Sequence, residues 1–181
     1  MKKKIIFLTI AFFYLFAAQI NPVQAEEITV AGISAVPKDR LVATEKDVRI
    51  TKLEEYLAQK QSILADQAEI FIQMSDKYGL AEYDLDFLVP AITGLESSYA
   101  KHYPQGSYNA YGWNGGDFYW DSWEESIEHV TRVLRQKYID RGADTVWKIG
   151  PIYAESPTWA QRVALIKGQI EAFNTEPEIS I

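Results

Sequence analysis

The segment YDLDFLVPAITGLES, residues 83–97, is the stretch that decides the expected fold. Its apolar residues recur three and four positions apart, which predicts a helix that is buried on most sides. These residues are Leu85, Leu88, Val89, Ile92 and Leu95. Pro90 lies inside the segment and is expected to kink the helix or to split off its first turn. Glu96 is the only carboxylate in the second half of the segment.

A helical pattern also precedes this segment. Between residues 47 and 78, apolar side chains recur at spacings of three, four or seven, which is typical of helices with one buried face. Ser62 can cap a second helix within this stretch, because its hydroxyl oxygen can accept from amides of the first turn. Gly79 is expected to end it.

Helix signals return after residue 121. Ser122 and Glu125 form a capping box, in which the hydroxyl and the carboxylate each accept from a free backbone amide. A short helix is predicted over 145–149, and Gly150-Pro151 is expected to stop it. Ser156-Pro157 is a strong start for the last helix. The chain is therefore predicted to be mainly α-helical.

Aromatic residues and glycines alternate between residues 99 and 123. Nine of the chain's 24 aromatic residues fall within these 25 positions. Such a composition favours loops or a small β-hairpin over a helix.

The first 25 residues resemble a secretory signal peptide. Three lysines precede Ile5–Ala18, which has 14 residues and no charge, and Val23-Gln24-Ala25 provides small residues for cleavage after Ala25. An uncleaved anchor is the alternative, but the apolar run is short for a membrane span. The expected organisation is a signal peptide (1–25), a mobile leader (26–46), a helical arm (47–61), a helical domain (62–174) and a tail (175–181). The chain is thus expected to be secreted, periplasmic or in the cell envelope, without a stable span after processing.

Composition and charge exclude several classes of function. The 181 residues are 48% apolar and 24% charged, which is globular. Without residues 1–25 the chain has 15 basic and 25 acidic residues, a net charge of −10, so nucleic acid and anionic bilayers are not expected partners. No cysteine is present, and His102 and His129 are each expected at the surface, so neither a metal nor a cofactor is expected.

Two features have the chemistry of a glycan site. A carboxyl group at the end of an apolar helix, beside an aromatic loop, favours the protonated form that a general acid needs, and Glu96 has this position. Aromatic faces with hydroxyl and amide groups beside them suit sugar rings. The expected wall of such a site is Ser107, Asn109, Tyr111 and Trp113.

Four segments of this sequence, in their order along the chain, resemble segments of the lysozyme-like enzymes that cleave bacterial cell walls. Gly94-Leu95-Glu96-Ser97-Ser98-Tyr99 is similar to their Glu-Ser segment, and 107–113 resembles the loop that lines their cleft. Segments 120–127 and 152–157 are similar to the glucosaminidases of glycoside hydrolase family seventy-three. The resemblance covers about residues 64–173 and implies a lysozyme-like domain with a small loop or hairpin region at a glycan cleft.

The resemblance also implies roles for individual residues. Glu96 would be the catalytic acid, Tyr153 would reach it, and Asp117 is a candidate second carboxylate. Ser97 belongs to the same motif as Glu96 and joins the loop residues as a candidate for substrate binding. The implied substrate is peptidoglycan or another N-acetylhexosamine glycan, cleaved at β-1,4 bonds by a monomer.

Two other classes of function remain open. In place of the Gly-Leu-Met-Gln of lytic transglycosylases, the loop reads Gly-Trp-Asn-Gly over 112–115, which favours a protein that binds glycan without turnover. An exported helical interaction protein, with residues 47–78 as its partner surface, would not depend on glycan.

Overall fold

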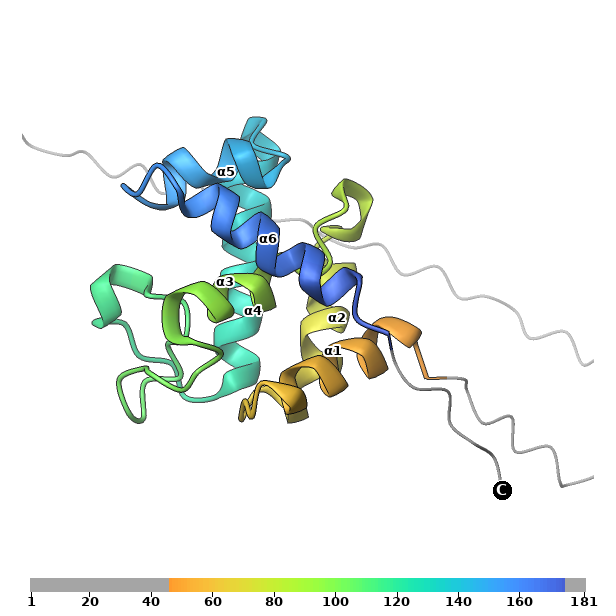
Figure 1. Cartoon of the computed structure of the whole chain (residues 1–181). Helices are drawn as coiled ribbons and strands as arrows, with labels where there is room; N and C mark the ends of the chain where they lie inside the picture. Colours follow the sequence, from red (N-terminus) through yellow and green to blue (C-terminus); the bar gives the residue numbers. More distant parts are fainter. Residues whose placement is uncertain (1–45, 175–181) are drawn as a thin grey trace, which may run out of the picture. The chain divides into compact units, whose positions relative to one another are not determined.

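The computed structural model describes residues 46–174, which form six α-helices joined by loops and short turns (Figure 1). The helices are α1 (Val48–Gln59), α2 (Ala68–Lys77), α3 (Leu88–Ser97), α4 (Trp123–Val133), α5 (Val146–Tyr153) and α6 (Trp159–Glu171). The prediction of a mainly α-helical chain is confirmed. The expectations for the signal peptide, for nearly all of the leader and for the tail fall on residues outside the described range.

The aromatic segment 99–123 is a series of loops and turns up to the start of α4. Residues 46–174 contain no strand, so the hairpin expected as one possibility is absent. Tyr99, Ala100 and Tyr108 have φ values of 62°, 59° and 52°, which turn the chain where a strand needs extended dihedral angles. Residues Trp113–Gly116 form a tight turn in which Asn114 and Gly115 are left-handed, with φ values of 52° and 66°.

Helix α3 contributes the centre of the core, and α6 packs against it (Figure 1). Leu88, Ala91 and Ile92 of α3 are fully buried. The helix begins five residues later than expected, because residues 81–83 form a separate 3-10 turn. Pro90 is the third residue of α3, where a backbone amide has no partner within the helix, so the proline fits without a kink.

Helix α1 is part of the same core and is not a separate arm. Its Leu53, Tyr56 and Leu57 are at most 2% exposed. The Tyr56 ring meets the Phe173 ring edge to face at 5.6 Å, and Lys52 Nζ donates to the Glu171 carbonyl at 2.7 Å. Residues 47–61 therefore belong to the helical domain, whose expected start at residue 62 is corrected to the beginning of α1.

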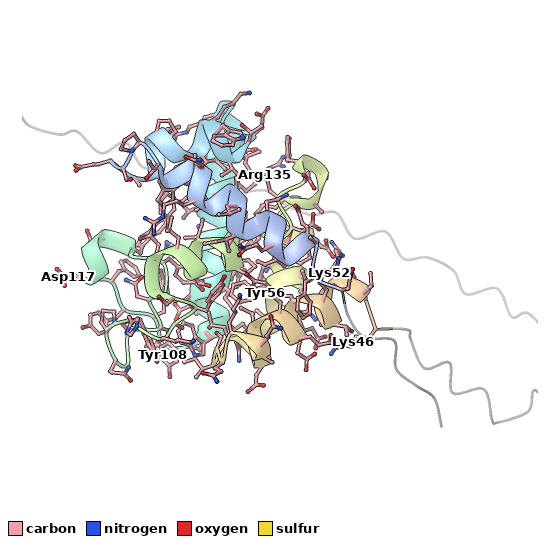
Figure 2. All side chains as sticks on the ribbon, in the orientation of Figure 1. Lys46, Lys52, Tyr56, Tyr108, Asp117 and Arg135 are labelled. Atoms are coloured by element: carbon pink, nitrogen blue, oxygen red, sulfur yellow. The ribbon has the colours of Figure 1, made fainter. Side chains whose placement is uncertain are left out.

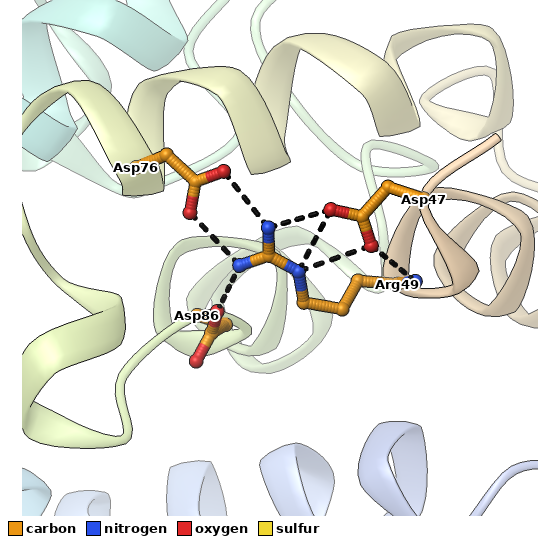
Figure 3. Close-up of polar contacts among 4 residues, drawn as sticks. All are labelled: Asp47, Arg49, Asp76 and Asp86. Atoms are coloured by element: carbon orange, nitrogen blue, oxygen red, sulfur yellow. Dashed lines mark hydrogen bonds and ion pairs between the residues drawn. The ribbon is translucent and has the colours of Figure 1, made fainter. Parts of the chain in front are cut away.

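One arginine ties the start of α1 to α2 and to the segment before α3 (Figure 3). The Arg49 guanidinium donates to both oxygens of Asp76 at 2.8 Å, to Asp86 at 2.6 Å and to Asp47 at 2.6 Å. These carboxylates raise the pKa of Arg49 above its usual range, and Arg49 in turn lowers the pKa of Asp47. The cluster holds the first turn of α1 against α2 and against the segment before α3.

The capping box at the start of α4 is confirmed with one difference. Ser122 Oγ accepts from the Glu125 amide at 3.1 Å, but Glu125 Oε2 accepts from the amide of Asp121 rather than that of Ser122. After α4 the helix continues as a π-helical segment over 134–138.

Helix α5 does not stop at Gly150-Pro151, and this expectation was wrong. The helix runs on to Tyr153 because Gly150 packs directly against α6: a Cβ built on it would lie 2.7 Å from Ala160 Cβ. Helix α6 begins at Trp159, three residues after the start expected at Ser156. Within residues 46–174, no helix combines the length and the apolarity needed to cross a membrane.

Candidate active site

Glu96 lies in the last turn of α3, and its side chain is held by one hydrogen bond. The indole Nε1–H of Trp159 donates to Glu96 Oε1 at 2.7 Å. Trp159 is the first residue of α6 and is 3% exposed, whereas Glu96 is exposed. The carboxylate is therefore not enclosed by apolar walls as expected. The Glu96 carboxylate is exposed to solvent, and the indole N–H of Trp159 that donates to it is buried.

Tyr153, the last residue of α5, lies beside this pair. Its ring stacks on the Trp159 ring, with centroids 4.6 Å apart and an interplanar angle of 25°. Its hydroxyl donates to the Tyr111 carbonyl at 3.0 Å and not to Glu96. Burial, and secondarily the charge of Glu96, raises the pKa of Tyr153 well above its usual value, so the phenol keeps its proton.

Four of the five residues expected to bind sugar are buried inside the loop region. They are Ser97, Ser107, Asn109 and Tyr111, each at most 3% exposed. The Asn109 amide donates to the carbonyls of Trp113 (2.9 Å) and Phe118 (3.1 Å), and its oxygen accepts from the Trp113 amide at 3.0 Å. Asn109 thus holds the turn that carries Trp113 rather than facing a ligand.

The two serines also satisfy the backbone. Ser97 Oγ donates to the Ala110 carbonyl at 2.8 Å and accepts from the Ala100 amide at 2.9 Å. These two hydrogen bonds attach the loop to the end of α3. Ser107 Oγ donates to the Pro104 carbonyl at 2.6 Å. These side chains are the scaffold of the site, because their polar atoms already have partners in the interior.

Gly112 and Trp113 form the accessible edge of the loop. Gly112 has φ +66°, and a Cβ built on it would lie 3.1 Å from Glu96 Oε2, so a larger residue there would be strained and would press on the carboxylate. Trp113 is half-buried. A cavity of about 190 Å³ opens beside them, lined by Gly112, Trp113, Asn114, Tyr138 and Tyr153.

Asp117, the candidate second carboxylate, lies at the outer edge of this loop (Figure 2). It is exposed, and its amide closes the 113–116 turn onto the Asn114 carbonyl at 3.1 Å. Among the described residues, no hydrogen bond or ion pair joins its carboxylate to another group. Its environment is that of a solvated turn residue.

His129 is part of the site region, contrary to the surface position expected for it. Its ring lies 5.8 Å from Trp113, 5.6 Å from Phe118 and 5.5 Å from Trp120, centroid to centroid. Burial among these rings, followed by the charge of Arg132, lowers its pKa. His102 is exposed, as expected.

Trp159 also belongs to the candidate site, although it was not among the residues expected there. The available signal was its position shortly after Ser156-Pro157, within a segment already singled out. A larger cavity, of about 440 Å³, lies between α5 and α6 around Trp147 and Glu155, and neither Glu96 nor Tyr153 lines it. Within residues 46–174, no three metal-ligating side chains come together.

No protein-family model, no curated protein and no solved structure matches this chain. The chemistry assigned to the site therefore depends on its own residues.

Proposed function

We propose that this chain is an exported, lysozyme-like glycosidase that cleaves β-1,4 bonds of bacterial peptidoglycan, with Glu96 as the general acid. The supporting observation is the convergence of three distant segments: Glu96 from α3, Tyr153 and Trp159 from the α5–α6 junction, and Gly112-Trp113 from the loop. Gly112, Trp113 and Tyr153 line the 190 Å³ cavity, Glu96 lies against Gly112, and Trp159 contacts both Glu96 and Tyr153.

In this proposal each residue has one role. Glu96 gives its proton to the glycosidic oxygen as the bond to the anomeric carbon breaks. The Trp113 ring lies against the apolar face of a sugar. The Tyr153 hydroxyl already donates to the Tyr111 carbonyl, so its oxygen lone pairs remain free to accept from an acetamido N–H of the substrate.

One carboxylate is sufficient for such a reaction. The acetamido oxygen of the sugar attacks its own anomeric carbon while Glu96 protonates the leaving oxygen, as in substrate-assisted glycosidases. Water then opens the cyclic intermediate, or an internal hydroxyl closes on the sugar to give an anhydro product. The surface position of Asp117 favours this route over one that needs a pair of carboxylates.

A glycan-binding protein without turnover is the second candidate. The exposure of Glu96 favours it, because a carboxylate open to solvent lacks the enclosed, apolar environment that is typical of catalytic acids. The third class, a helical interaction protein using 47–78, loses support because α1 and α2 bury their apolar faces in the core.

The test is digestion of purified peptidoglycan followed by mass analysis of the fragments. Glu96→Gln keeps the shape of the side chain but removes the transferable proton, and turnover should fall about 10²- to 10⁴-fold. Glu155→Gln, a change at an exposed carboxylate outside the site, should leave the rate unchanged.

Two results would contradict the proposal. If Glu96→Gln digests at the parent rate, the assignment of the acid is wrong. If the parent binds a chitin-type oligosaccharide but releases no fragments, the protein is a binding protein.

A further inference from the structure

We infer that Trp159 is the positioning residue of the site: it fixes the Glu96 side chain and determines which carboxyl oxygen carries the reacting proton. This inference rests on the proposed role of Glu96 as the acid. It concerns a residue outside the loop and assigns distinct roles to the two oxygens of one carboxyl group.

The two oxygens have different neighbours. Oε1 accepts the Trp159 indole N–H at 2.7 Å, and an indole nitrogen can only donate. A neutral carboxyl group accepts more strongly at its carbonyl oxygen than at its hydroxyl oxygen, so the protonated form keeps Oε1 as the carbonyl bonded by the indole and carries its hydrogen on Oε2. Oε2 is the oxygen beside Gly112, where the missing side chain leaves it uncovered.

The oxygen that carries the proton therefore faces the accessible part of the loop. Gly112 lines the 190 Å³ cavity together with Trp113 and Tyr153. Oε1 is bonded to the buried Trp159, and Oε2 lies beside Gly112, one of the residues that line this cavity. This division of roles is what a proton donor needs, because the transferable proton must be within reach of the glycosidic oxygen.

Trp159 is held firmly enough to impose this orientation. It is 3% exposed, begins α6, and stacks on Tyr153, which is bonded in turn to the Tyr111 carbonyl. An exposed glutamate without such a partner samples several rotamers. The indole N–H selects one of them and so acts on Glu96 rather than on the substrate.

The activity test is Trp159→Phe, which retains an aromatic ring against Tyr153 and removes the N–H. We expect kcat to fall about 10- to 100-fold with KM nearly unchanged, because misplaced reacting groups lose rate rather than binding. Trp147→Phe, at a 61% exposed tryptophan of α5, is the matched control and should change neither.

A second measurement needs no activity. In ¹H–¹⁵N spectra, the Trp159 indole resonance, assigned by its loss in Trp159→Phe, should move in Glu96→Gln, because that change replaces the carboxylate acceptor of the indole N–H with an amide. An indole resonance at the same position in the parent and in Glu96→Gln, or an unchanged kcat in Trp159→Phe, overturns the inference. Neither result contradicts the proposed function. The proposed function fails only if the parent and Glu96→Gln digest peptidoglycan at the same rate, or if the parent does not digest it.

Discussion

Gly150→Ala should destabilise the protein, whereas Gly168→Ala should stabilise it, although both glycines are inside helices. At Gly150 a new Cβ would lie 2.7 Å from Ala160 Cβ. Carbon atoms pack at about 3.5–4.0 Å, so α5 and α6 would have to separate by roughly 1 Å. At Gly168 in α6 a new Cβ meets nothing within 4 Å.

The magnitudes follow from these two environments. Overpacking costs about 1–3 kcal/mol, and the better helix propensity of alanine returns about 1 kcal/mol, so Gly150→Ala should lose roughly 1 kcal/mol. Gly168→Ala has only the propensity gain of about 0.5–1 kcal/mol. At about 4 °C per kcal/mol for a domain of this size, the melting temperatures should differ by several degrees.

Urea unfolding followed by circular dichroism measures both variants against the parent. Gly150→Ala should also lose activity, because it pushes Gly150 and Ala160 apart. Tyr153 comes three residues after Gly150, and Trp159 comes directly before Ala160, so both site residues would move. If Gly150→Ala is as stabilising as Gly168→Ala, the close packing of α5 on α6 is refuted.

Three further outcomes are expected. Trp113→Ala should weaken binding of a chitin-type oligosaccharide by about 1–3 kcal/mol, measured by calorimetry; unchanged binding with a lower melting temperature would mean that the ring is only structural. Burial lowers the pKa of His129 below its ordinary 6.5, so as pH drops through 6.5 the unfolded chain binds a proton before the folded one and the free energy of unfolding should fall. His129→Phe should flatten this fall between pH 7 and 5, whereas His102→Phe should not. Arg49→Leu leaves three carboxylates facing one another and should cost about 2 kcal/mol at pH 7, discounted for their partial exposure. Arg49 lowers the pKa of Asp47 below 3.8, so the parent keeps this stabilisation above that pH and loses it on acidification, and a urea-unfolding difference that does not shrink towards pH 3 would contradict the cluster.

The helices could be predicted because their signals are local. The capping residues Ser122 and Gly79 act within a few positions, and the apolar spacing in α3 reports directly on its burial. The continuation of α5 through Gly150 could not be predicted in this way. It depends on how closely α6 approaches, which is a tertiary fact.

The sequence predicted which segments come together at the candidate site, but not the direction of their side chains. Polar residues near aromatic rings suggested a sugar-binding wall, yet Asn109 and Ser107 turn inward because the loop's own amides and carbonyls need partners. The same limit applies to His129, which lies off the apolar stripe of α4 but is covered by rings from a loop. Residue types indicate which chemistry is possible at the candidate site. Only the fold shows which of these polar groups already have hydrogen-bond partners inside the protein.

The contact between the first and last helices has a consequence for the order of events during synthesis. Lys52 bonds to Glu171, 119 positions later, and α3 needs α6 to cover it. About 60 residues separate the end of α3 from the start of α6, which a ribosome takes roughly 3–12 s to add. During that interval the strongly apolar helix α3 lacks its main partner, so the nascent chain exposes apolar surface until its final helix has emerged.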